Sequence, residues 1–180
     1  MIATLRNAIE QILEWFLIFL MVVLTVIVIV AVLFRIAGDS LSWYDEVAAV
    51  NLSWITYYGA ALAALKRAHI GFDTVLLALP LGLRMLGLIV AEIAVIGFFV
   101  IMAYTGWTVL QVLGGDYLVS LTWVPVRFTQ SVIPIGAVLF ILCELLSLPE
   151  YWRMTARGTS LEHAEIEEEV ESELKKAGAR

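Results

Sequence analysis

The chain has 180 residues, of which 62% are hydrophobic and 16% are charged, and its formal net charge is −6. This composition excludes an ordinary soluble domain, in which about 25% of residues are charged. The few basic residues lie scattered near the ends of apolar runs, so nucleic acid is not an expected partner. Cys143 is the single cysteine, which excludes an internal disulfide and a cysteine metal cluster.

The first predicted element is the run Trp15–Phe34, twenty residues without a charge. A helix of about 20 residues crosses a bilayer core of roughly 30 Å. A cleaved secretory signal is disfavoured, because Glu10 and Glu14 follow the basic residue Arg6 and the apolar stretch exceeds the usual length of a signal. We therefore expect an uncleaved first transmembrane helix.

The second predicted span is Val47–Leu65, nineteen residues without a charge. Asp45 and Glu46 open it, where negative charge suits the helix dipole, and either carboxylate could pair with Arg35 across the preceding loop. Trp54 lies in mid-helix and either meets a neighbouring helix or faces lipid. Small residues that would let another helix approach closely are Gly59, Ala60, Ala63 and Ala64.

The segment after the second span contains His69 and Asp73, four residues apart. As chemistry, this spacing offers a metal-binding pair, or a general base with its orienting acid. Neither a third ligand nor a nucleophile lies near them in the sequence. The pattern favours a charged helix end with His69 at the level of the lipid headgroups.

Residues 73–83 (DTVLLALPLGL) are mostly apolar but too few to cross a bilayer. Pro80 would remove a helical hydrogen bond within them. The stretch is therefore either an interfacial helix on the cytoplasmic surface or a kinked extension of the third span.

The third and fourth predicted spans, Leu86–Leu110 and Phe128–Leu148, carry one charge each, Glu92 and Glu144. An unpaired charge inside hydrocarbon costs several kcal/mol or is neutralised. One interpretation is a proton or cation path, although two carboxylates without an intramembrane Asp, His or Lys make a poor relay. The favoured interpretation is structural: each carboxyl group is protonated, or pairs with a basic group of another subunit or with Lys66, Arg67 or Arg84.

The segment Leu113–Gln130 joins the last two spans and is expected to lie against the outer surface, because a Gly-Gly-Asp turn precedes an aromatic, proline-bearing stretch. The tail, residues 159–180, has seven acidic and three basic groups. Thr159 and Glu162 fit a capping box, and Ile166, Val170 and Leu174 recur at every fourth residue. The tail is thus a short amphipathic cytoplasmic helix or a solvated segment, following a four-helix membrane domain over residues 1–158.

The basic residues predict the orientation of the spans. With the N-terminus inside, the outer loops contain only Arg35 and Arg127. Orientation follows the Lys/Arg bias of the loops, so both termini are predicted to be cytoplasmic. The basic residues of the inner segments near the membrane are Arg6, Lys66, Arg67, Arg84, Arg153 and Arg157.

Motifs of catalysis are missing from the sequence: it contains no HExxH, serine elbow, P-loop or glycine-rich dinucleotide fingerprint. The residues by themselves therefore predict an all-α integral membrane protein of four transmembrane helices with no evident active site, forming part of a larger complex.

An ordered set of residues also carries a family resemblance. It comprises Ser40-Leu41-Ser42-Trp43 with Glu46, then Trp54, Gly59-Ala60, Ala63, Arg67, His69-Ile70, Asp73 and Leu79-Pro80, and later Pro125 with Pro134-Ile135-Gly136. In these positions the chain resembles the small permease (Q) subunit of tripartite ATP-independent periplasmic (TRAP) transporters, the DctQ type. The resemblance covers roughly residues 15–150. Two departures are the region of Arg127 and Gln130, where the family often has aromatic residues, and the acidic tail after Gly158.

The resemblance implies a role in the bacterial inner membrane. A periplasmic solute-binding (P) subunit captures an organic anion, such as a carboxylate or a sugar acid, and delivers it to a large permease (M) subunit. Sodium and solute bind in that large subunit, so no cofactor or metal is expected in this chain. The small subunit is implied to be a scaffold, surrounded by membrane lipid and by the large subunit, with no catalytic residues of its own.

The residues expected to act in interfaces or structure, rather than in catalysis, are Arg35, Trp43, Glu46, Gly59, Arg67, His69, Asp73, Glu92, Arg127 and Glu144. Two alternatives to the transport role stay open at this point. One is a small intramembrane enzyme that uses Glu92, Glu144 or His69. The other is a membrane scaffold or sensor, unrelated to transport, that acts through the tail.

Overall fold

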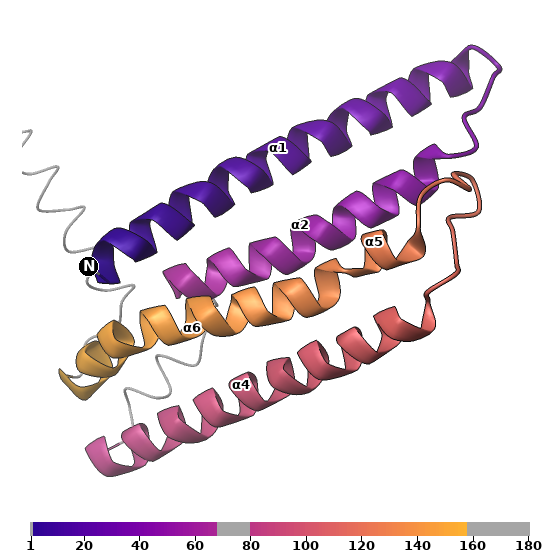
Figure 1. Ribbon diagram of the computed structural model, residues 1–180. Coiled ribbons are helices and arrows are strands. Elements are labelled where there is room, and N and C mark those ends of the chain that lie inside the picture. Colours follow the sequence, from indigo (N-terminus) through magenta and orange to yellow (C-terminus); the bar gives the residue numbers. More distant parts are fainter. Residues whose placement is uncertain (1, 68–79, 158–180) are drawn as a thin grey trace, which may run out of the picture.

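The computed structural model describes residues 2–67 and 80–157, which are almost entirely helical (Figure 1). Outside the helices, these residues form one isolated β-bridge, between Tyr117 and Pro125. The prediction of an all-α fold is confirmed. The helices are α1 (Ile2–Ile36), α2 (Tyr44–Lys66), α4 (Leu81–Val112), α5 (Val126–Gln130) and α6 (Val132–Arg157).

Four helical stretches are long and apolar enough to cross a membrane: Leu5–Ile36, Tyr44–Lys66, Leu81–Val112 and Val126–Ala156. The chain is therefore a multi-pass membrane protein. Each stretch is longer than the apolar run that predicted it, and some of the added polar residues have partners on other helices. Ion pairs of this kind join Arg6 to Glu150, and Lys66 to Glu10 and Glu14.

The start of α4 bears on the two alternatives for residues 73–83, and at their C-terminal end it favours an extension of the third span. Pro80 is the N-cap of α4, and Leu81–Leu83 form its first turn. A proline suits the start of a helix, where its missing N–H leaves no helical hydrogen bond unmade. An interfacial helix that extends to Leu83 is therefore wrong at its C-terminal end. The described residues do not include 68–79, so His69, Asp73 and the predicted segment up to residue 79 lie outside them. The helix predicted over 159–180 lies outside them as well.

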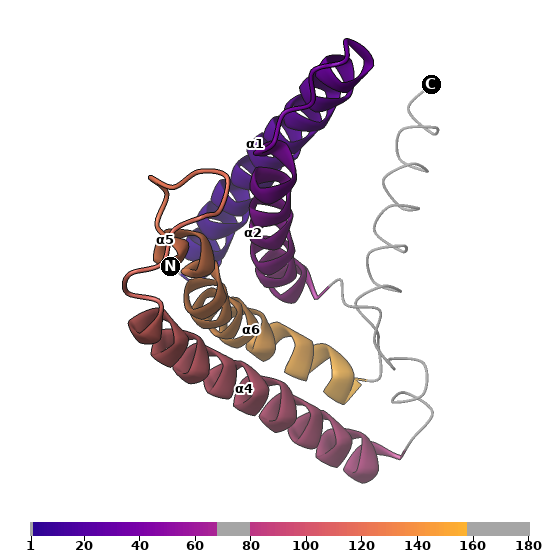
Figure 2. The same cartoon turned by 90° about the vertical axis from the view of Figure 1, so that its right-hand side faces the viewer.

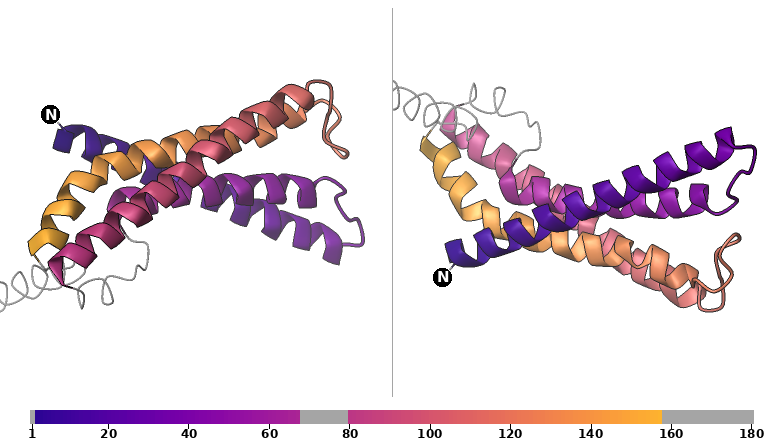
Figure 3. Two further views of the ribbon diagram at one scale, coloured as in Figure 1. Left: turned by 90° about the horizontal axis from the view of Figure 1, so that it is seen from below. Right: turned by 90° about the horizontal axis from the view of Figure 1, so that it is seen from above.

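The fourth span is divided into α5 and α6, which the sequence did not predict. Pro134 has no N–H to donate to the carbonyl of Gln130, and its ring would crowd that carbonyl in a continuous helix. The helix breaks at Ser131 and starts again at Val132. Pro149 lies inside α6 near its C-terminal end, where the helix curves (Figure 3).

The long helices form a curved layer rather than a closed bundle (Figure 2). Their order across the layer is α1, α2, α6 and α4, so the fourth span lies between the second and the third. Helix α4 packs on α6, and α1 packs mainly on α2. The two central helices therefore hold the layer together, and α1 and α4 are its edges.

The core lies where α1, α2 and α6 meet, and small side chains of α2 make the contact close. Ala61 and Ala64 have no exposed surface, and neither does Cys143 of α6. Small residues bring helix backbones together, and this packing drives helix association in lipid. The buried core residues are Leu13, Ala61, Ala64, Leu65, Phe140 and Cys143.

Two glycines set how closely the other helices approach α6. A Cβ added to Gly136 would lie 2.8 Å from the Cβ of Tyr57 on α2. One added to Gly106 of α4 would lie 3.0 Å from Ile133 Cγ2 and 3.2 Å from Pro134 Cδ. About one turn further along α6, the rings of Phe99 and Phe140 stack with centroids 3.6 Å apart and join α4 to α6. Helix α6 is thus fitted against both α2 and α4.

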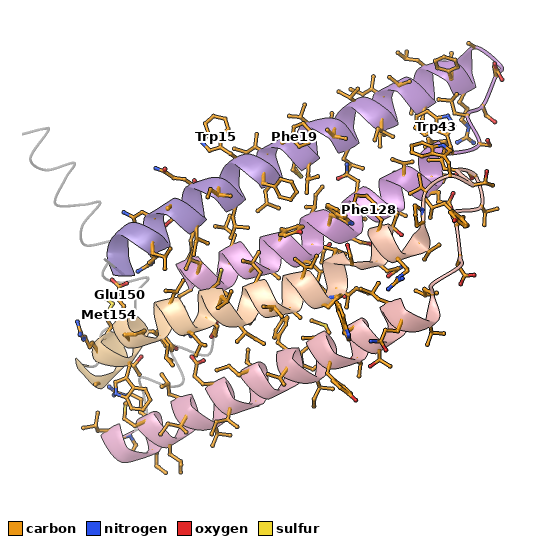
Figure 4. The ribbon with its side chains drawn as sticks, in the orientation of Figure 1. Trp15, Phe19, Trp43, Phe128, Glu150 and Met154 are labelled. Atoms are coloured by element: carbon orange, nitrogen blue, oxygen red, sulfur yellow. The ribbon has the colours of Figure 1, made fainter. Side chains whose placement is uncertain are left out.

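Large apolar side chains on the edge helices point away from the layer. Trp15 and Phe19 of α1 are 72% and 61% exposed, and both point away from α2 (Figure 4). On α4, Phe98 and Ile101 are similarly exposed. In a chain with four membrane-spanning helices, such faces suit lipid or the helices of another subunit.

Candidate functional site

Most of the predicted site residues that the structure describes lie toward one end of the layer or the other. One end carries the start of α1 and α4 and the finish of α2 and α6 (Figure 1). A buried charge cluster made of Arg67, Glu92 and Glu144 lies toward this end. At the other end, the loop between α4 and α5 contacts the start of α2.

Arg67 is the C-cap of α2 and has a left-handed backbone, with φ of 53° and ψ of 26°. Glycine is the usual residue at such a position, because a side chain makes the left-handed conformation costly. The backbone N–H of Arg67 donates to the carbonyls of Ala63 and Ala64, which closes the helix. This turn directs the guanidinium toward α6 and α4.

The Arg67 guanidinium joins three helices. Its Nη1 donates to Glu92 Oε1 on α4 at 2.6 Å and lies 2.8 Å from Glu144 Oε1 on α6. Its Nε donates to Ser147 Oγ at 2.8 Å, and its Nη2 donates to the carbonyl of Glu144 at 3.3 Å. The guanidinium carbon also lies 4.6 Å from the ring centroid of Tyr151. The guanidinium is therefore bound by both α4 and α6.

Burial makes these contacts strong. The side chains of Arg67 and Glu92 are each 11% exposed, and that of Glu144 is 7% exposed. Ser147 is fully enclosed, and its hydroxyl donates to the carbonyl of Ala64, which ties α6 to α2 a second time. Because a low dielectric strengthens both the attraction and the cost of losing a partner, the cluster fixes the relative positions of α2, α4 and α6.

The structure selects among the partners that the sequence allowed for Glu92 and Glu144. Both carboxylates pair with Arg67. Lys66 pairs instead with Glu10 and Glu14 of α1, and Arg84 donates to the carbonyl of Thr155 at 3.2 Å. The basic residues at this end therefore make different connections: Lys66 joins α2 to α1, and Arg84 joins α4 to α6.

At the opposite end, Glu46 binds the loop that follows α4. Its Oε1 accepts the backbone N–H of Val119 at 2.9 Å, and its Oε2 accepts that of Ser120 at 2.8 Å. The Ser120 hydroxyl donates to the carbonyl of Ser42 at 3.0 Å. Glu46 thus caps a turn 73 residues away in sequence, rather than pairing with Arg35.

This contact lies where the layer spreads apart. Toward the end with the loops, the α1–α2 pair and the α4–α6 pair diverge (Figure 3). The loop crosses from α4 and α5 to α2, and Glu46 fixes it there. Trp54 of α2 makes a second connection, to α5. Its indole N–H donates to the carbonyl of Thr129 at 3.1 Å, and its ring centroid lies 5.4 Å from that of Phe128. Trp54 therefore meets a neighbouring segment.

The other predicted site residues are not brought together. Arg35 is exposed at the end of α1, Trp43 is the half-buried N-cap of α2, and Arg127 is exposed on α5. A Cβ added to Gly59 would lie 4.0 Å from Leu17 Cδ2 of α1. Sequence reasoning missed Ser147, although its position one helical turn after Glu144 was a usable signal, because residues three apart share a helix face.

The arrangement connects helices rather than forming a reactive centre. Within residues 2–67 and 80–157, no three His, Cys, Asp or Glu side chains gather in a way that could hold a metal ion. Each charge of the cluster faces an opposite charge of the same chain. Chemically, the site can hold three helices in register across the layer.

Most of the chain matches the model of a known protein family. The family model described as "Tripartite ATP-independent periplasmic transporters, DctQ component" matches residues 24–154. The match begins within α1 and ends within α6, so it covers α2, α4, α5, the charge cluster and Glu46. No curated protein matches the chain.

Proposed function

Because the chain belongs to the DctQ component family and is thus a small membrane subunit of a TRAP transporter, we propose that it is the scaffold for the large permease subunit. The scaffold supports sodium-coupled import of an organic anion, such as a carboxylate or a sugar acid. The large subunit binds solute and sodium. A periplasmic solute-binding subunit delivers the solute to it.

One observation supports the scaffold role: the charged side chains of the buried charge cluster form ion pairs with one another, within this chain. Arg67, Glu92 and Glu144 pair with one another and connect three of the four spans. A solute or ion pathway needs polar groups that can bind and release a passenger. Charges that are paired within the chain suit a fixed support, against which a transport domain of the large subunit moves.

The family match removes the enzyme alternative, because the family is a component of transporters and not an enzyme. It also disfavours a scaffold unrelated to transport. The matched region ends at residue 154, so the tail, through which such a scaffold was expected to act, is not needed for the match.

The proposed location is the bacterial inner membrane, with both termini in the cytoplasm. Five basic residues of the described chain lie toward the end of the layer that carries the N-terminus, against Arg35 and Arg127 toward the other end. This distribution supports the orientation, because basic residues are retained on the cytoplasmic side. The five are Arg6, Lys66, Arg67, Arg84 and Arg153.

Deletion tests the function directly. The chain is expressed with a purification tag alongside its large permease and solute-binding subunits, and solute uptake is measured with and without a sodium gradient. Co-purification of the large subunit and loss of sodium-driven uptake on deletion of this chain are expected. Uptake that continues unchanged without the chain rejects the proposal.

A further inference from the structure

The buried charge cluster contains two carboxyl groups for one guanidinium. Glu92 and Glu144 both direct their Oε1 atoms at Nη1 of Arg67, at 2.6 and 2.8 Å. Two carboxylates that meet at one nitrogen lie close to each other. If both were ionised, the cluster would carry one excess negative charge inside the membrane.

From the part of the chain that the structure describes, the second oxygen of Glu92 receives no hydrogen bond that would stabilise a negative charge on it. Within the described residues, Glu92 Oε2 is buried and has no hydrogen-bond partner. The whole residue is only 9% exposed. An anionic oxygen without a donor is costly in such a place, and a neutral carboxyl oxygen is much less so.

We propose that the Glu92–Glu144 pair binds one proton, so that the cluster contains one guanidinium, one carboxylate and one carboxylic acid. The bound proton removes the repulsion between the two carboxylates and leaves the cluster without net charge. Because the two groups interact strongly, the proton belongs to the pair and not to either residue alone. It is a structural ligand that joins α4 to α6 beside Arg67.

The groups around the pair are consistent with a held proton. Helix α2 contributes Arg67, and α6 contributes Ser147 and Tyr151, both of which contact the guanidinium. Arg84 of α4 donates toward Thr155. The charges of α1 near this end, Glu10 and Glu14, pair with Lys66 on the exposed side of α2.

The bound proton makes the free energy of unfolding depend on pH. In an unfolded chain at neutral pH, both carboxyl groups are ionised. The folded cluster then binds one more proton than the unfolded chain, so the free energy of unfolding falls as pH rises. Removing the proton in the folded state would leave two carboxylates against one guanidinium and loosen α4 from α6.

Infrared difference spectroscopy of the purified transporter complex tests the proposal, by comparing wild type with Glu92→Gln and with Glu144→Gln at neutral pH. A deuterium-sensitive C=O stretching band of a protonated carboxyl group is expected to be lost in each variant, because Arg67 balances the carboxylate that remains. Glu150→Gln, which changes an exposed partner of Arg6, is the matched control and should lose only a carboxylate band. If Glu92→Gln and Glu144→Gln also lose only carboxylate bands, the proposal is wrong.

A second measurement does not depend on the variants folding. The melting temperature of the wild-type complex is followed between about pH 6 and pH 9, a range in which an exposed carboxyl group does not titrate. A melting temperature that falls as the pH rises, together with loss of the protonated carboxyl band, supports the bound proton. A protonated carboxyl band that is missing from the wild-type spectrum at neutral pH, or one that stays while the complex melts earlier, overturns it.

Discussion

At the scale of single residues, Arg67 connects α2 to both α4 and α6. It closes α2 in a left-handed conformation and binds Glu92, Glu144 and Ser147 on two other helices. Its neighbour Lys66 has the same charge but a different role, because Lys66 and its acidic partners are substantially exposed. The two residues therefore make a matched pair for mutation.

We predict that Arg67→Ala destabilises the chain by about 3 kcal/mol or more, because it leaves two carboxyl groups buried without their cation. Lys66→Ala should cost about 0–1 kcal/mol, since exposed ion pairs contribute little. Thermal unfolding of the purified complex in detergent measures both. Equal effects of the two substitutions would contradict the role given to Arg67.

Glu46 acts at a distance, on the loop after α4. We predict that Glu46→Ala speeds hydrogen exchange at the backbone amides of Val119 and Ser120, because both N–H groups lose their acceptor. The substitution should weaken assembly or transport more than it changes the choice of solute. Asp45→Ala is the control, since Asp45 is exposed and adjacent. Unchanged protection in Glu46→Ala, or altered solute preference with normal assembly, would argue against this role.

At the scale of helices, the fit between α2 and α6 depends on Gly136. We predict that Gly136→Ala costs about 1–3 kcal/mol, because the new methyl group would meet the Cβ of Tyr57 at 2.8 Å. Gly97→Ala on α4 is the control, since its Cβ would meet nothing within 4 Å. It should be neutral or stabilise the helix by up to about 1 kcal/mol.

The melting temperatures of Gly136→Ala and Gly97→Ala relative to wild type measure the difference. A fall that is confined to Gly136→Ala is expected. If both variants melt like the wild type, α2 and α6 do not make a close contact at Gly136 and Tyr57.

The apolar runs predicted the four spanning helices, because length and hydrophobicity decide which segments cross a bilayer. Their bounds were less predictable. Helix α1 extends back to Ile2 because its polar first turns pair with other helices, and such partners are invisible in a single sequence. The break at Ser131 was readable in principle from Pro134, and it was missed because the apolar pattern continues through it.

The composition of the charge cluster was only partly predictable. The cost of a charge in hydrocarbon singled out Glu92 and Glu144 and required a partner for each. It did not determine that both share Arg67, since that depends on α6 lying between α2 and α4. Similarly, the acidic start of α2 suggested local pairing, whereas Glu46 binds a loop that only the fold brings near it.

At the scale of the whole molecule, the tail after Gly158 lies outside the family match. We predict that a chain truncated after Gly158 still assembles with the large subunit and supports uptake, because the charge cluster and the Glu46 contact are all retained. Uptake by cells that express the truncated chain, at matched protein levels, measures this. Loss of uptake despite normal assembly would give the tail a function in transport.

For the molecule as a whole, we propose a support subunit that binds neither solute nor sodium. A structure of the assembled transporter, determined in the presence of its solute and sodium, tests this most directly. We predict that both bind within the large subunit, with α1, α2, α4 and α6 packed beside it and Arg67 still paired with Glu92 and Glu144. A solute molecule or sodium ion enclosed by the helices of this chain would contradict the account.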